Sequence, residues 1–210
     1  MLDQITLFIL GWLGGVVSPA VVEAIKTRRE TSAVLGAVKT ELNEVAYRLV
    51  LASYSVENHL GTTDRAVLKW VQDSMVLYHG TEPKESIANY ITTQLSLPDE
   101  ALAAFVASNA AQGVEALVLP KFTLPFVDAR VPGWHNVPAS VRLELLAIHA
   151  DMRLLNDAVD QSRTYFNLTF SKLEGRNETA VTQNLRGAYK QYGKRSHLAA
   201  DRMQRLQAVL

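Results

Sequence analysis

Histidine is the side chain best suited to acid–base catalysis or metal binding near neutral pH, and the sequence contains five histidines. They are scattered along the chain, at His59, His79, His135, His149 and His197. We expect none of them to share a helical metal site with a second histidine, or with a carboxylate three or four residues away. The absence of cysteine excludes disulfides, thiol nucleophiles and thiolate zinc sites. We therefore predict neither a metal nor any other cofactor.

Acidic residues could supply a catalytic pair within residues 139–173, where the sequence has Glu144, Asp151, Asp157 and Asp160. Arg153, however, precedes Asp157 by four residues, and Arg163 follows Asp160 by three, which is the spacing of solvated ion pairs on a helix. The sequence contains no phosphate-binding glycine loop, nucleophile elbow or dinucleotide fingerprint. The residues therefore favour a protein without catalytic activity, and an enzyme whose site is assembled from distant residues is the alternative.

The stretch Trp134, His135 and Asn136 resembles a binding site more than any other part of the sequence. It combines an indole, an imidazole and an amide between flanking prolines, and it could contact a partner or a small ligand. Alternatively, Trp134 fills the core while Gly133 and Asn136 form the turn, which is the more common use of these residue types. We favour this second interpretation.

Basic residues are concentrated towards the end of the chain, although Lys and Arg total 21 in the whole sequence against 21 Asp and Glu. Arg186, Lys190 and Lys194 are spaced four residues apart and therefore share one side of a helix, here called the basic face. The basic face could contact anionic lipid headgroups or a polyanionic partner. A solvated face, balanced by acids elsewhere in the fold or in a homo-oligomer, is the simpler interpretation. Nucleic acid is not an expected partner, because the chain has no net charge and few aromatic side chains accompany the basic ones.

One uncharged stretch near the N-terminus runs from Ile5 to Val22. As a helix it would measure about 27 Å, close to the thickness of the hydrocarbon core of a bilayer. Its Ile, Leu, Phe and Val side chains contribute on the order of −3 to −6 kcal/mol to membrane insertion, which Gly, Ser, Thr and Pro partly offset. We therefore predict a single N-terminal transmembrane helix, with residues 1–30 forming a membrane anchor and its basic flank.

Two alternatives to a membrane anchor are a cleaved secretion signal and a buried helix of a soluble protein. A secretion signal needs positive charge before its apolar stretch, whereas the leader here contains Asp3 and no Lys or Arg. A buried helix would be weakened in water by Gly11, Gly14, Gly15 and Pro19, residue types that are common in membrane helices. The sequence therefore favours the anchor.

Charge on either side of the apolar stretch predicts its orientation. Lys26, Arg28 and Arg29 follow the stretch, and only the α-amino group is positive before it. The positive-inside rule then places residues 31–210 in the cytoplasm and the anchor in the inner membrane. The run from Ser18-Pro19 into residues 23–30 resembles the N-terminal anchors of bacterial single-pass membrane proteins. This resemblance implies membrane attachment and no particular activity.

Small residues recur every four positions within the apolar stretch, as Gly11 with Gly15 and Gly14 with Ser18. This spacing lets a second helix approach closely in a membrane. It predicts self-association as a homo-oligomer, the alternative being that the spacing arose by chance.

Residues 31–119 have the apolar spacing of four helices. The first continues the anchor from Val34 to Val56 and ends at Gly61. A threonine after Gly61 is expected to cap the second helix, which carries the apolar positions of residues 67–78. A third helix is expected over residues 84–95 and a fourth over residues 98–119.

The four prolines of residues 120–138 predict a long irregular connection, attached to the core by its aromatic side chains. Apolar seams from Val141 to Leu173 and from Val181 to Leu206 then predict two long helices that pair as a hairpin. The predicted fold is all-α, with a single N-terminal transmembrane helix followed by an irregular bundle of five to six helices that ends in a long C-terminal helical hairpin.

The combination of an anchor with helical seams and no catalytic motif predicts a membrane-tethered, non-catalytic interaction or scaffold module, which binds a protein partner or itself. One alternative is a membrane-bound helical effector or enzyme with a site near Trp134 and His135. The second alternative is a soluble helical protein that buries residues 5–22.

Overall fold

The computed structural model describes residues 2–112, 117–130, 134, 137–170 and 175–210; at residues 2–20, 111–112, 130 and 175–176 it describes the backbone alone. Within these ranges the chain forms helices and no strand, which confirms the all-α prediction. The helices are α1 (Leu2–Leu60), α2 (Arg65–Leu77), α3 (Glu85–Ser96), α4 (Asp99–Gln112), α5 (Pro125–Arg130), α6 (Ala139–Thr169) and α7 (Gly175–Gln207). Counting α1, the described residues form seven helices, one more than the upper limit of the five to six predicted.

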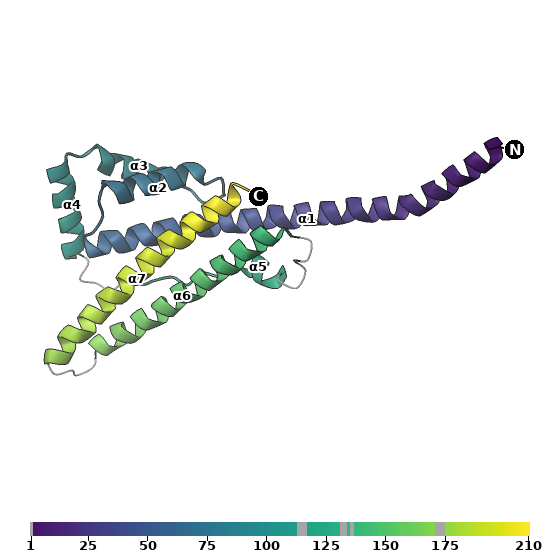
Figure 1. Cartoon of the computed structure of the whole chain (residues 1–210). Coiled ribbons are helices and arrows are strands. Elements are labelled where there is room, and N and C mark those ends of the chain that lie inside the picture. Colours follow the sequence, from purple (N-terminus) through teal and green to yellow (C-terminus); the bar gives the residue numbers. More distant parts are fainter. Residues whose placement is uncertain (1, 113–116, 131–133, 135–136, 171–174) are drawn as a thin grey trace.

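The first helix, α1, runs unbroken for 59 residues. Its C-terminal half lies inside the bundle, whereas its N-terminal half projects beyond the other helices (Figure 1). The inner half is buried along one predicted face, at Val38, Leu42, Val45, Leu49 and Val56. No loop or turn separates the projecting half from the core.

Among the helices whose side chains are described, none is both long and apolar enough to cross a membrane. The predicted transmembrane helix, residues 5–22, lies outside the described side chains except for Val21 and Val22, which are both exposed. The predicted packing residues Gly11, Gly14, Gly15 and Ser18 also lie outside them.

Gly61 ends α1, as predicted, with a backbone φ of 70° that glycine adopts without a steric clash. The Thr62 N–H then donates to the Glu57 carbonyl at 2.9 Å, in the pattern of a helix C-terminal cap. The prediction of a threonine cap for α2 was wrong. Asp64 lies closer to the helix, and its carboxylate accepts a hydrogen bond from the Val67 N–H at 2.8 Å.

The helices α6 and α7 pack against each other, which confirms the predicted C-terminal hairpin. Their antiparallel direction is evident from Arg202 of α7, which lies 3.9 Å from Glu144 and 3.3 Å from Asp151 of α6. Both predicted seams are largely buried, at Val141, Leu145, Ile148, Met152, Leu155 and Val159 of α6 and at Tyr192, Ser196, Ala199, Met203 and Leu206 of α7. Helix α6 ends at Thr169, before the predicted limit at Leu173, which lies outside the described residues.

Helix α7 also packs along the inner half of α1. Since α7 contacts both α1 and α6, it is the central helix of the bundle. At one point of contact between α1 and α7, the Ser53 hydroxyl donates to the Gly193 carbonyl at 3.1 Å. Of the remaining helices, α2 packs on α1 and α3, while α4 and α5 pack on α1 (Figure 1).

Two predictions about the middle of the chain were wrong. Helix α4 ends at Gln112, and residues 117–119 are not helical, with Leu119 buried in the core. The connection 120–138 contains the short helix α5. This helix begins at Pro125, because proline at the first helical position removes an N–H that has no partner within the helix.

The non-helical segment before α5, residues 117–124, is attached to the hairpin by side chains from α6 and α7. The Asn156 amide donates to the Phe122 carbonyl at 2.8 Å and accepts from the Phe122 N–H at 3.1 Å. The Tyr192 hydroxyl donates to the Pro120 carbonyl at 2.9 Å, and burial raises the pKa of this phenol. Phe122 and Phe126 are partly buried against the core, as predicted for the aromatic residues of this connection.

Glu41 of α1 caps the start of α5, since its carboxylate oxygens accept from the Phe126 N–H at 2.8 Å and the Val127 N–H at 3.0 Å. Glu41→Ala should lower the free energy of unfolding by about 1–2 kcal/mol, because it removes both acceptors from these backbone groups. Urea unfolding followed by circular dichroism measures the change. Glu30→Ala, at an exposed position on the projecting half of α1, is the control and should change stability by less than about 0.5 kcal/mol. Equal midpoints for Glu41→Ala and the wild type would show that this cap contributes nothing.

Candidate interaction sites

Trp134 lies in the core, with 5% of its surface exposed, and is grouped there with Val127, Val137 and Val141. His135 and Asn136 lie outside the described residues. The burial fits the interpretation that Trp134 fills the core, and it leaves the indole no surface to offer a partner.

Three acids of α6, Glu144, Asp151 and Asp160, form ion pairs with residues outside α6. Asp160 contacts Lys121 at 2.7 Å, whereas the sequence suggested Arg163. The His149 Nε2 atom lies 3.2 Å from an Asp128 oxygen of α5. Within the described residues, no three His, Asp or Glu side chains gather closely enough to hold a metal ion. The ion pairs of Glu144 and Asp151 join α6 to α7, that of His149 joins α6 to α5, and that of Asp160 joins α6 to the segment before α5.

Sequence reasoning missed a cluster of Trp70, His197 and Asp201 between α2 and α7. The Trp70 and His197 rings are stacked, with centroids 3.7 Å apart and planes inclined by 7°. Trp70 Nε1 donates to Asp201 at 2.7 Å, and the other Asp201 oxygen lies 3.5 Å from His197. The four-residue spacing of His197 and Asp201 was visible in the sequence, but their contact with Trp70 of α2 was not. Because the three side chains stack on or hydrogen-bond to one another, we infer that the cluster holds α2 and α7 together.

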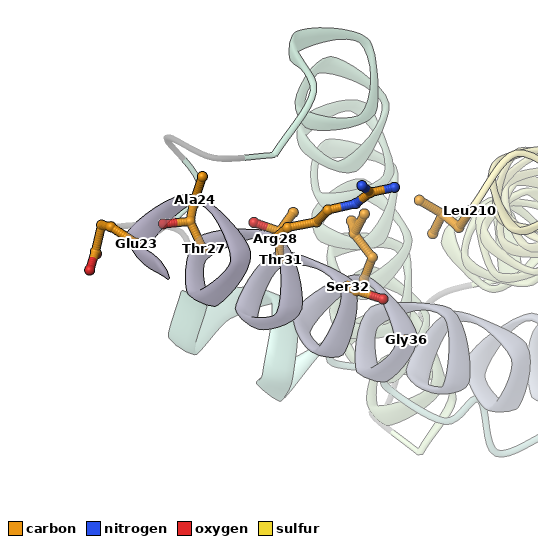
Figure 2. Close-up of a pocket in the computed structure, with 9 residues that line it drawn as sticks. Glu23, Ala24, Thr27, Arg28, Thr31, Ser32, Gly36 and Leu210 are labelled. Carbon is orange, nitrogen blue, oxygen red and sulfur yellow. The ribbon is translucent and has the colours of Figure 1, made fainter. Parts of the chain in front are cut away.

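An open groove, here called the stalk groove, lies where the end of α7 meets the projecting half of α1 and encloses about 900 Å³. Figure 2 shows Arg28 reaching from α1 towards Leu210. The α1 side is lined mainly by small residues, and the full lining is Glu23, Ala24, Thr27, Arg28, Thr31, Ser32, Leu35, Gly36 and Leu210. Leu35 lies seven residues before the buried Leu42, so the groove continues the face of α1 that the bundle covers.

A second cleft, here called the basic cleft, encloses about 310 Å³ between α7 and the end of α1. Arg186 and Lys190 of the basic face line one side of it, and Glu57, Leu60 and Thr62 line the other. Lys194, the third residue of the basic face, is exposed and does not line the cleft. The structure thus divides the basic face into two residues at a concave surface and one outside it.

The basic cleft lies at the opposite end of α1 from residues 5–22. At a rise of about 1.5 Å per residue, about 50 Å of helix separates Val22 from Glu57. A membrane crossed by residues 5–22, with α1 upright, would be out of reach of Arg186 and Lys190.

Comparisons of the chain with protein-family models, with curated proteins and with solved structures gave no match.

Proposed function

We propose that the protein is a membrane-tethered, non-catalytic helical module that presents its bundle to a protein partner or to further copies of itself. The observation that carries the proposal is the division of α1, one half of which is core while the other half projects beyond the bundle (Figure 1). A single helix with no intervening loop would hold the bundle at a fixed distance and orientation from whatever surrounds its N-terminal half.

The composition of the projecting half favours a membrane as its surroundings. Residues 5–22 carry no charge, and transfer of each large apolar side chain out of water contributes about 1.5–3 kcal/mol. Where the side chains are described, Val21, Val22 and Ile25 remain about half exposed. Charged residues begin at Glu23, so the apolar stretch ends abruptly, as a membrane segment does.

The stalk between the apolar stretch and the bundle is short. About 20 Å of helix separates Val22 from Gly36, which lines the stalk groove together with Leu210. Lys26, Arg28 and Arg29 lie on this stalk, at the level where anionic headgroups would be found. In this proposal the bundle faces the cytoplasm, close beneath the inner membrane.

Self-association is part of the proposal. The small pairs Gly11 with Gly15 and Gly14 with Ser18 would permit close packing of two such helices in a bilayer. The stalk groove extends a surface of small residues beyond the membrane. Chemical cross-linking in native membranes should therefore yield a homo-oligomer, and an exclusively monomeric product would remove this part of the proposal.

Carbonate extraction of membranes tests the tether. The full chain should remain with the membrane pellet, and a variant that lacks residues 1–22 but keeps the whole buried part of α1 should be released. Circular dichroism on the shortened variant checks that its bundle is still helical. Release of the full chain by carbonate would contradict the proposal.

A reporter fused after Leu210 tests the orientation separately. A reporter that works only in the cytoplasm should be active there, because the positive flank follows the apolar stretch. Activity of a reporter that works only in the periplasm would reverse the assignment and leave the tether itself intact.

A further inference from the structure

We propose that the basic cleft binds a soluble, phosphorylated small molecule. The anion site itself does not depend on the membrane tether, because the cleft is formed entirely by α7, the end of α1 and residue Thr62. The preference for a soluble ligand over a membrane lipid rests in part on the proposed tether.

The two cations of the cleft are available for a ligand. Arg186 and Lys190 are one helical turn apart and exposed, and neither forms an ion pair with a carboxylate in the described part of the chain. A guanidinium group can bind two phosphate oxygens at once, and an ammonium group adds a compact charge beside it. Gly187 lies between them in the lining, and a Cβ built there meets no atom within 4 Å, so the backbone at this point is open to a ligand.

Glu57 is the one carboxylate in the cleft lining. It accepts a hydrogen bond from the Thr62 hydroxyl, and its negative charge opposes an anion bound by Arg186 and Lys190. Two positive groups against one negative group leave the cleft with a net positive charge. Removal of the Glu57 charge should therefore strengthen anion binding.

The His59 imidazole can report on the charge of Arg186. Its ring is edge-on to Tyr189, with centroids 5.3 Å apart. Burial lowers the pKa of His59, and the nearby charge of Arg186 lowers it further. A phosphate bound to Arg186 should partly cancel this second effect and move the pKa of His59 upwards.

The dimensions of the cleft favour a small molecule over a bare ion or a membrane. A volume of about 310 Å³ is at the lower end of the range for ligand sites. Leu60 provides an apolar wall for the non-phosphate part of the ligand. The position of the cleft, about 50 Å along α1 from Val22, argues against a lipid of the tethering membrane.

Titration calorimetry on the full chain in detergent, with pyrophosphate as the probe, tests the assignment. We expect saturable binding that Arg186→Ala or Lys190→Ala weakens about tenfold each, the usual effect of losing a charge-assisted hydrogen bond. Glu57→Gln should tighten binding several-fold. Lys194→Ala is the matched control, since it removes a cation from the same face but outside the cleft, and it should leave affinity unchanged.

A proton NMR titration of the His59 imidazole provides a second readout. Pyrophosphate should raise the pKa of His59 in the wild type and not in Arg186→Ala. The proposal is overturned by an absence of saturable binding, by equal effects of Lys194→Ala and Arg186→Ala, or by equal competition from chloride at the same ionic strength. Binding to phosphatidylglycerol vesicles that depends on Arg186 and Lys190, without binding of pyrophosphate, would overturn the assignment to a soluble ligand.

Discussion

Gly193→Leu should destabilise the bundle by about 3 kcal/mol, at the upper end of what overpacking a well-packed contact costs. At Gly193 a Cβ atom would lie 3.0 Å from Val56 Cγ1 and 3.3 Å from Val56 Cβ, which is closer than a normal contact. A leucine would separate α7 from α1 and stretch the hydrogen bond from Ser53 to the Gly193 carbonyl. Because α7 packs against both α1 and α6, the loss of its close packing with α1 should lower the stability of the whole bundle. Denaturant titration followed by circular dichroism measures this global unfolding.

Gly187→Leu is the matched control, because it changes the same residue type in the same helix at an open position. Leucine is about 0.5–1 kcal/mol more favourable than glycine inside a helix, so this variant should be slightly stabilised. Gly193→Ala should fall between the two, since its helical gain offsets part of the steric cost. If Gly187→Leu and Gly193→Leu change stability equally, close packing of α1 and α7 is not what Gly193 provides.

The double variant Leu10→Arg, Leu13→Arg should move the protein from the membrane to the soluble fraction. An arginine near the centre of a membrane helix costs about 2.5–3.5 kcal/mol on the insertion scale. Two such changes outweigh the contribution of the apolar side chains, which is on the order of −3 to −6 kcal/mol. The small and polar residues of the stretch already reduce that contribution. Fractionation of cell lysates by ultracentrifugation and immunoblotting measures the shift.

Ile25→Arg is the control for this prediction. It places an arginine on the same helix, at a half-exposed position beyond the apolar stretch. This variant should remain in the membrane fraction, because an added cation in the flank agrees with the proposed cytoplasmic orientation. Retention of the double variant in the membrane would show that residues 5–22 are not what attaches the protein.

The long helices could be predicted from the sequence, because helical periodicity is a local property that the apolar seams report directly. Leu145, Ile148 and Leu155 of α6 are all fully buried at the predicted spacing. The end of α1 at Gly61 was equally predictable, since a left-handed cap strongly favours glycine.

The contacts between helices could not be predicted, because they depend on which elements meet. The sequence paired Asp160 with Arg163 on its own helix, yet Asp160 contacts Lys121 from a distant segment. Similarly, α5 was missed because its start is capped by Glu41, from a helix that precedes it by many residues. Local pattern cannot show a capping group supplied by another element.

For the candidate sites too, local features could be predicted from the sequence, whereas contacts between distant segments could not. The basic face followed from the spacing of Arg186, Lys190 and Lys194, but the cleft required Glu57 and Leu60 from the far end of α1. The distance of this cleft from residues 5–22 also required the structure. Trp134, in contrast, was correctly suspected of filling the core, since a large aromatic residue among prolines is usually buried.

Single-cysteine accessibility along α1 tests the central claim most directly, because the chain has no cysteine of its own. Ile9→Cys and Val16→Cys lie within the apolar stretch, whereas Lys26→Cys and Lys39→Cys lie at exposed positions after it. A charged maleimide added to inside-out membrane vesicles should label the two later positions and leave the two earlier ones unlabelled until detergent is added. Labelling of Ile9→Cys and Val16→Cys as fast as Lys39→Cys in intact vesicles would contradict a membrane-embedded helix that continues into the bundle.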